Sequence, residues 1–231
     1  LAGTVLVLVA ARVWRWPEGT TAVLLLAVPL GNTSFLGYPL VSALLGEDAL
    51  PPAVIYDQFG SFLMLSSVGL FVIARYAHGR PPSAAQMLRR VLRFPPFIAL
   101  LVALLLMPDT YPEPISAVLR RLSDALLPLV TLAIGMQVRL RLPRAQVRPL
   151  VFGLAGKLLL LPALAMLLVG PLGIDGAARG AVVLEAAMPT MITAMALAAA
   201  ARLAPELGAA LVGYGVVLSV LLLPMWQLLL R

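Results

Sequence analysis

The stretch "VPLGNTSFLGYPL", residues 28–40, interrupts a segment that otherwise has the composition of a membrane-spanning helix. Its glycine, asparagine and prolines disfavour a continuous helix, although every backbone N–H and C=O group in hydrocarbon needs a hydrogen-bond partner. A second interruption lies in "EAAMPTMITAM", residues 185–195, where Pro189 lacks an N–H and clashes with the preceding turn. Such breaks persist in a membrane where they are buried in protein or line a polar cavity.

The composition of the chain indicates an all-α polytopic membrane protein. Hydrophobic residues make up 61% of the 231 residues and charged residues 12%, with a mean hydropathy of +1.01. A soluble domain of this length needs a far larger charged share to cover its surface. Apolar segments predict about eight spans, the first being the end of a helix that begins before residue 1. These segments cover residues 1–13, 20–45, 51–76, 94–107, 116–138, 147–170, 176–201 and 207–229.

Charged residues in the connecting loops alternate in sign and predict the orientation of the chain. Arginine-rich loops follow the first, third and fifth segments, whereas acidic loops follow the second and fourth. Because positively charged loops stay in the cytoplasm, we expect the basic loop at 77–93 there and the C-terminus outside. The same distribution argues against a nucleic-acid partner, despite a net charge of +7. The charged loop residues are Arg12, Arg15, Glu47, Asp48, Arg75, Arg80, Arg89, Arg90, Arg93, Asp109, Glu113, Arg139, Arg141, Arg144 and Arg148.

The two interruptions lie five segments apart, and this spacing predicts an internal repeat. A unit of five spans is odd in number, so its second copy enters the membrane inverted relative to the first. Paired broken helices in inverted repeats indicate the binding site of a secondary transporter. The prediction divides the chain into the last three helices of one repeat (1–76), a basic cytoplasmic loop (77–93) and a complete five-helix repeat (94–231).

The residues of the two breaks are the candidate substrate-binding site. A half-helix that begins near Thr33 or Thr190 presents unpaired N–H groups with a partial positive charge, which suits an anion. The Asn32 amide adds two donors and one acceptor at the same place. The alternatives are a simple proline kink and an asparagine that joins two helices by a hydrogen bond. The candidate set comprises Gly31, Asn32, Thr33, Met188, Pro189 and Thr190.

Three ionisable residues inside the apolar segments are candidates for ion coupling. Asp57 has no basic partner in its own segment, so we expect it to carry a proton; the alternative is a helix-start carboxylate exposed at the outer face. Lys157 and Glu185 are expected to balance charge in the moving part of the protein, and the alternative is a structural ion pair between them. No cofactor is expected, and no metal is implied, because the absence of cysteine excludes thiolate sites and His78 lies in a basic loop without ligand partners. The chain has no phosphate-binding glycine loop, so ATP-driven pumping has no support.

Six motifs resemble those of the auxin efflux carrier family, which includes plant PIN carriers and bacterial malonate-type permeases. The resemblance implies ten helices in two inverted repeats, of which about eight are present here. It also implies a likeness to bile acid:sodium symporters and elevator-type alternating access. The family's asparagine contact to the substrate carboxylate would fall on Asn32, and the proline of the second break on Pro189. The motifs are "GNTSFLGYPLVSALLG", "IYDQFGSFL", "PPFIALLVALLL", "LPLVTLAIGMQV", "GKLLLLPAL" and "EAAMPTMITAMALA".

The sequence departs from the family pattern in ways that refine the expectation. Gly31 stands where PIN carriers have proline, and the short basic segment at 77–93 replaces their long hydrophilic loop, which indicates a bacterial-type member. We therefore predict an inner-membrane secondary transporter, not an enzyme, for small organic anions. Its expected partners are membrane lipid and a coupling ion, with a proton preferred to sodium, and a homodimer is left open. The alternative is a non-transporting membrane protein, such as a sensor, an assembly partner or a degenerate carrier fragment.

Overall fold

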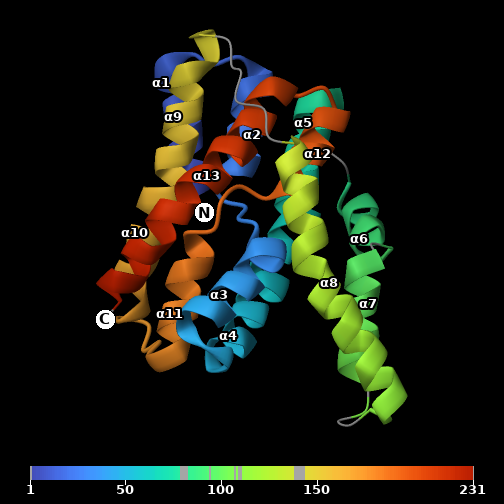
Figure 1. The fold of residues 1–231 in the computed structure, drawn as a ribbon. Coiled ribbons are helices and arrows are strands. Elements are labelled where there is room, and N and C mark those ends of the chain that lie inside the picture. Colours follow the sequence, from blue (N-terminus) through green and yellow to red (C-terminus); the bar gives the residue numbers. More distant parts are fainter. Residues whose placement is uncertain are drawn as a thin grey trace.

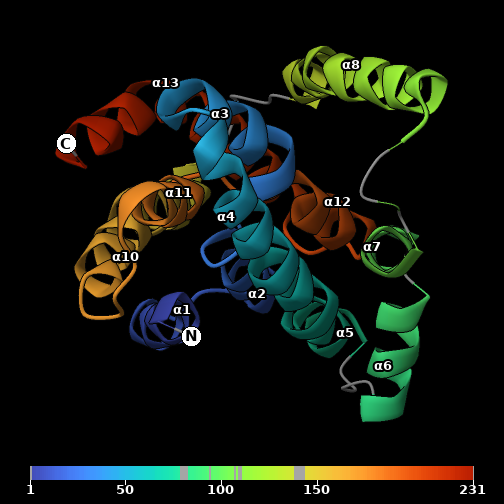
Figure 2. The same cartoon turned by 90° about the horizontal axis from the view of Figure 1, so that it is seen from below.

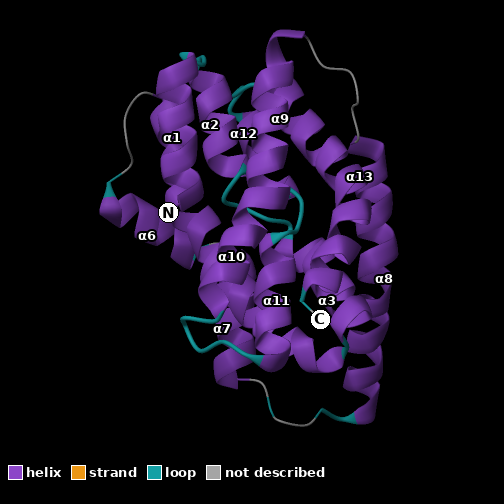
Figure 3. Cartoon of the chain, turned by 90° about the vertical axis from the view of Figure 1, so that its left-hand side faces the viewer, coloured by secondary structure: helices purple, strands orange, loops and turns teal. Residues whose placement is uncertain are grey.

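The computed structural model describes residues 2–78, 83–93, 95–106, 108, 111–137 and 144–230. Within these ranges the regular elements are helices (Figure 3). A lone bridge between Gly31 and Thr190 is the β-type pairing that accompanies them. The predicted all-α class is therefore confirmed. Four loop charges that entered the orientation prediction lie outside the described residues: Arg80, Asp109, Arg139 and Arg141.

The N-terminal part of the chain contains the first break at the predicted place. The chain leaves helical structure between α2 and η1, a π-helical turn, and then continues without interruption into α3. A single long helix follows, assembled from α-helical and π-helical stretches. The elements are α1 (Ala2–Trp14), α2 (Glu18–Ala27), η1 (Thr33–Gly37), α3 (Tyr38–Leu45), η2 (Glu47–Ala49), α4 (Leu50–Ile55), η3 (Tyr56–Phe62), η4 (Leu65–Gly69) and α5 (Leu70–His78).

Three helices in the middle of the chain lie to one side of the others (Figures 1 and 2). They are α6 (Ala84–Leu92), α7 (Pro95–Leu106) and α8 (Glu113–Gln137). The sequence prediction treated 77–93 as a loop and missed α6. Leu88 and Leu92 are four residues apart and lie on one face of the helix, and Arg89 and Arg93 share another face in the same way. The segment is therefore an amphipathic helix as well as a basic one.

The C-terminal part contains the second break, again where the sequence predicts it. α11 ends before the "MPT" motif and α12 resumes after it, while the neighbouring elements form long continuous helices. The elements are η5 (Arg144–Gln146), α9 (Val147–Ala155), η6 (Gly156–Leu160), α10 (Leu161–Val169), α11 (Gly176–Ala186), α12 (Ile192–Ala200) and α13 (Pro205–Leu229).

Among the described residues, three helices are long and apolar enough to cross a membrane: Glu47–Ala77, Arg144–Val169 and Pro205–Leu229. Shorter apolar helices at Ala2–Trp14, Glu18–Ala27 and Thr33–Leu45 accompany them. Large apolar side chains on the outer surface, including Val9, Leu167 and Leu221, are exposed. An exposed apolar surface of this extent suits lipid rather than water. The chain is therefore a multi-pass membrane protein, while the count of eight spans and the inverted repeat remain predictions.

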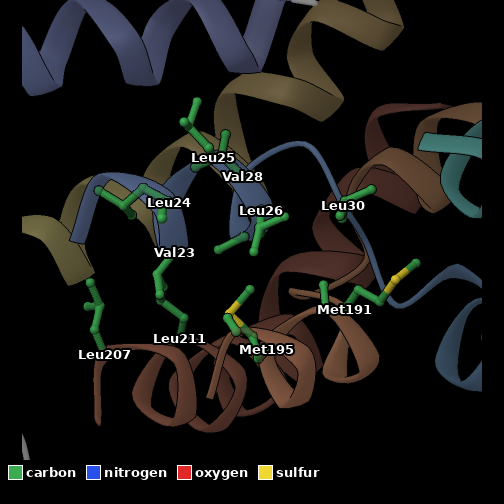
Figure 4. Packing of buried hydrophobic residues seen from close by; sticks show 14 of the residues in the cluster. Val23, Leu24, Leu25, Leu26, Val28, Leu30, Met191, Met195, Leu207 and Leu211 are labelled. Carbon is green, nitrogen blue, oxygen red and sulfur yellow. The ribbon is translucent and has the colours of Figure 1, made fainter. Parts of the chain in front are cut away.

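Each half of a broken helix packs in a different layer of the molecule. α2 is buried on all sides from Thr20 to Ala27, as expected of a helix that is apolar around its whole circumference. Its side chains meet Met195 of α12 and Leu207 and Leu211 of α13 (Figure 4). The other halves, α3 and α11, contribute to a second cluster of buried residues with α4 and α10. The two breaks therefore lie between two apolar clusters.

Candidate functional site

The two breaks pair with each other through their backbones. The Asn32 N–H donates to the Pro189 carbonyl at 2.7 Å, and the Met191 N–H donates to the Leu30 carbonyl at 3.0 Å. Gly31 and Thr190 face each other in the antiparallel bridge between these hydrogen bonds. Backbone N–H and C=O groups that lack a helical partner at one break are thus hydrogen-bonded by the other break. This satisfies the need of every backbone polar group in hydrocarbon for a partner. We call this arrangement, residues 30–33 with 188–191, the crossing.

Two side chains satisfy carbonyl groups where the first half of each broken helix ends. The Thr190 hydroxyl donates to the carbonyl of Ala27, the last residue of α2, at 3.3 Å. The Lys157 ammonium donates to the carbonyl of Ala186, the last residue of α11, at 3.1 Å. The last carbonyls of a helix have no intrahelical partner and carry a partial negative charge, so a hydroxyl and a cation are favourable there.

Asp57, on η3, is buried at 1% exposure and accepts hydrogen bonds from four side chains. Ser34, Tyr38 and Gln58 donate to its Oδ2 at 2.8, 2.7 and 2.9 Å, and the Thr33 hydroxyl donates to its Oδ1. The carboxylate lies at the start of the helix that resumes at Thr33, where a negative charge is stabilised. The alternative of an exposed helix-start carboxylate is therefore wrong.

Three of these donors, Ser34, Tyr38 and Gln58, were missed by the sequence prediction. Ser34 and Tyr38 are four residues apart and so share one face of the resumed helix, with Thr33 beside them. Polar residues grouped on one face of an otherwise apolar segment are the signal that indicates a buried partner. That partner is Asp57, on the following long helix.

Lys157 and Glu185 are both buried, at 2% and 0% exposure, but they do not form the hydrogen-bonded ion pair that the sequence left open. The Lys157 ammonium bonds to the Ala186 carbonyl instead. Both carboxylate oxygens of Glu185 are buried without a hydrogen-bond partner. Buried polar groups without a partner are rare and indicate a place where another chemical group belongs.

Two glycines of the first broken helix make room for these side chains. A Cβ at Gly31 would lie 2.9 Å from the Lys157 Nζ, and a Cβ at Gly37 would lie 2.6 Å from Glu185 Oε1 and closer still to Oε2. Gly31 is not among the glycines with positive φ, so a glycine is required there by this close approach.

The crossing brings together all six candidate substrate-binding residues, and all are buried. The hydroxyl groups of Thr33 and Thr190 are bound to Asp57 and Ala27, respectively. The Asn32 amide is 2% exposed, and its nitrogen has no hydrogen-bond partner. The first half-helix resumes at Thr33 as predicted, but the second begins at Ile192 rather than Thr190, because residues 190 and 191 extend the backbone pairing.

A separate cavity of about 480 Å³ lies between η4, α6 and α12. Ser66 of η4 and Leu197 of α12 line it, together with Arg89 of α6 and Arg93 just after that helix. The two arginines give this cavity a positive potential that attracts anions. Within the described ranges, no group of three or more histidine, aspartate or glutamate residues is placed to hold a metal ion.

Fold and site together define a multi-pass, all-α membrane protein built around two broken helices that cross by backbone pairing. The chain belongs to the membrane transport protein family, whose sequence profile matches residues 1–227. This membership confirms the resemblance to auxin efflux carriers and supports a membrane transporter.

Two relatives are similar along nearly the whole chain. An uncharacterized transporter of Methanothermobacter thermautotrophicus is 31% identical over 233 residues, covering 100% of this chain and 74% of the relative. An uncharacterized transporter of Methanocaldococcus jannaschii is 26% identical over 232 residues, covering 97% of this chain and 73% of the relative. Their names support transport and specify no substrate.

Proposed function

We propose that this chain forms a secondary transporter that carries small organic anions across the inner membrane and is driven by a proton gradient in preference to a sodium gradient. The observation that carries the proposal is the buried, unpaired amide nitrogen of Asn32 at the crossing. An amide donor that is desolvated without a partner is costly. A substrate carboxylate supplies the missing acceptor.

The electrostatics of the crossing support a negatively charged substrate. The Lys157 ammonium lies against Gly31, next to Asn32. The helices that resume at Thr33 and Ile192 both begin at the crossing, and the N–H groups of a first helical turn favour an anion. Arg89 and Arg93, in the cavity between α6 and α12, favour approach of anions by their long-range attraction.

The six candidate residues have distinct proposed roles at the crossing. Asn32 donates to the substrate, while Thr33 and Thr190 bind it after they exchange their present partners. Gly31 leaves space for Lys157, and Met188 and Pro189 form the apolar wall on the second broken helix. Asp57, Lys157 and Glu185 are the three candidates for coupling substrate binding to the ion gradient.

The proposed architecture is a pair of inverted repeats that moves in an elevator-type cycle. Its support is that each part of the chain supplies one broken helix, and that the two breaks pair with each other through their backbones. α6, α7 and α8 lie to one side of this body (Figure 2). In the proposed cycle the body containing the crossing slides past them and exposes the buried site to alternate sides.

Binding of malonate to the purified full chain tests the substrate class. Losing a hydrogen bond to a charged partner costs about 1.5–3 kcal/mol, which corresponds to roughly ten- to a hundredfold in affinity. Asn32→Ala is therefore expected to weaken malonate binding at least tenfold, measured by calorimetry in detergent. Its apo melting temperature is expected to change little, because the amide nitrogen has no hydrogen bond to lose in the protein without substrate.

Gln227→Ala is the matched control, since it removes a side-chain amide whose nitrogen donates to the Leu44 carbonyl at 2.5 Å. It removes an amide remote from the crossing and should leave malonate affinity unchanged. Normal malonate binding by Asn32→Ala, together with early melting, would make Asn32 a structural contact. If the intact protein binds and transports neither malonate nor other small carboxylates, the non-transporting alternative is favoured.

A further inference from the structure

We propose, on the basis of the transport function above, that Glu185 carries the coupling proton, whereas Asp57 holds the resumed helix in place. The carboxyl group of Glu185 lies against Gly37, in a position that we call its seat. The proposal moves the proton from the residue that the sequence favours to a different carboxyl group. It rests on the contrast between the surroundings of these two buried side chains.

The hydrogen-bond partners of the two carboxyl groups differ completely. Asp57 accepts from Ser34, Tyr38 and Gln58, and also from Thr33, so its negative charge is satisfied by protein donors. Glu185 is 0% exposed, and neither of its carboxylate oxygens meets a donor. An ionised carboxylate in such a site is costly, and a proton removes the charge. Protonation of Glu185 therefore removes a buried charge that no protein donor satisfies.

The seat of Glu185 couples its protonation to the crossing. Its carboxylate lies where a side chain at position 37 would be, and Gly37 is one turn beyond Asn32 on the same resumed helix. The Gly37 N–H bonds to the Asn32 carbonyl at 3.1 Å. Glu185 itself precedes the second break, and its carbonyl accepts from the Met188 N–H at 3.2 Å. A change at Glu185 thus acts on both broken helices.

The charges around Glu185 link the proton to an anionic substrate. The charged groups that interact electrostatically with Glu185 are Asp57 from η3 and Lys157 from η6. The phenol groups of Tyr38 and Tyr56 also interact electrostatically with its carboxylate. With Asp57 and Lys157 ionised, a protonated Glu185 leaves these three side chains without net charge. An ionised Glu185 leaves one net negative charge, which disfavours a second anion nearby. Protonation of Glu185 therefore favours binding of a carboxylate at Asn32.

The proton step is a simple acid–base exchange. A Glu185 carboxylate oxygen accepts a proton from water on the side with the higher proton concentration, and an O–H bond forms. After the site has opened to the other side and the anion has left, the same O–H bond breaks and the proton passes to water there. No oxidant, reductant or further reactant takes part.

Infrared difference spectroscopy of the purified full chain tests the protonated state without any substrate. We expect a C=O stretching band of a protonated carboxyl group near neutral pH that shifts in D₂O. Glu185→Gln should remove this band, and Asp57→Asn should retain it. A band that survives unchanged in Glu185→Gln, or the absence of any such band from the folded wild-type protein, overturns the proposal. This result is independent of whether malonate is transported.

Uptake of malonate into proteoliposomes tests the coupling. Glu185→Gln is expected to retain measurable malonate exchange while its stimulation by a pH gradient falls at least tenfold. Asp57→Asn, even if slower, should still respond to the gradient. Wild-type stimulation of Glu185→Gln by the pH gradient contradicts the proposal. So does a sodium-gradient stimulation of the wild type that Glu185→Gln abolishes, since Glu185 then serves sodium instead.

Gly37→Ala tests the seat. The added Cβ displaces the Glu185 carboxyl group, so the infrared band of that group should shift or vanish. Gly60→Ala is the matched control on η3, because a Cβ there meets no atom within 4 Å. The control should preserve both the band and the pH-gradient response. An unchanged band in Gly37→Ala would show that Glu185 does not depend on this seat and would overturn that part of the proposal.

Discussion

At the scale of single residues, the crossing depends on how closely side chains approach the backbone of the first break. Gly31 admits the Lys157 ammonium, and Gly37 admits the Glu185 carboxyl group. Both charged residues come from the C-terminal part of the chain, and both glycines come from the N-terminal part. A small residue type is thus required by a neighbour that is remote in sequence, not by the local conformation of the chain.

Gly31→Ala is predicted to destabilise the protein. The new Cβ would lie 2.9 Å from the Lys157 Nζ and 3.4 Å from the Glu185 carbonyl, so the ammonium must move and its bond to the Ala186 carbonyl is strained. Overpacking of this kind costs about 1–3 kcal/mol. Thermal unfolding in detergent should show a lower melting temperature than for wild type or Gly60→Ala. A wild-type melting temperature would mean that Lys157 relocates without cost.

The same scale shows the limit of sequence reasoning about the site. Asn32, Pro189, Asp57, Lys157 and Glu185 stand out because polar residues and helix breakers are rare within apolar segments. Their partners do not stand out in this way. The four donors to Asp57 and the lack of any donor to Glu185 follow from three-dimensional contacts, and the ion pair left open for Lys157 gives way to a helix-end carbonyl.

At the scale of secondary-structure elements, the breaks are stabilised by each other and π-helical stretches surround them. η1, η3 and η6 are π-helical, and they carry Thr33, Asp57 and Lys157, respectively. π-helical turns are often found at functional sites because they redirect side chains and free carbonyl groups. One such carbonyl, that of Leu158 in η6, accepts from the Trp226 indole N–H at 3.0 Å.

Pro189→Ala is predicted to weaken malonate binding at least tenfold. The alanine supplies the N–H that proline lacks and so permits helical structure through the second break. A continuous helix would remove the extended backbone that pairs with Asn32 and Leu30. Calorimetry with malonate measures the loss, and Pro224→Ala, inside α13, is the control for removal of a helix proline. Wild-type affinity in Pro189→Ala would mean that backbone pairing maintains the break without the proline.

At the scale of the whole molecule, two apolar clusters enclose the crossing, and α6, α7 and α8 lie outside this body (Figure 1). Many large apolar side chains remain on the outer surface. The orientation of the molecule in the membrane rests on the alternation of charge between its loops.

Site-directed labelling tests this orientation without background, since the chain has no cysteine. Ser83→Cys, next to the arginines of α6, should react with a membrane-impermeant maleimide from the cytoplasmic side. Tyr111→Cys, before α8, should react from the outer side, and its side chain is 37% exposed. Inside-out and right-side-out vesicles provide the comparison. The reverse pattern of labelling would invert the predicted topology.

The sequence by itself determined the helical class, the membrane environment and the positions of both breaks, because these depend on local properties. Apolar length specifies a span, and Pro189, Gly31 and Asn32 disfavour helix wherever they stand. α6 shows the limit of this reasoning. Its amphipathic spacing of apolar and arginine residues indicates a helix, but its high charge led to the prediction of a loop.

Only the tertiary structure decided which groups meet at the crossing. The Thr190 hydroxyl serves the Ala27 carbonyl across 163 positions of sequence, and the Glu185 carboxyl group rests on Gly37 of the other broken helix. Hydrogen bonding and desolvation act on distances in space, and chain positions far apart carry no local signal of their proximity. For this reason the sequence identifies the buried ionisable residues, whereas the fold decides which of them have hydrogen-bond partners and which do not.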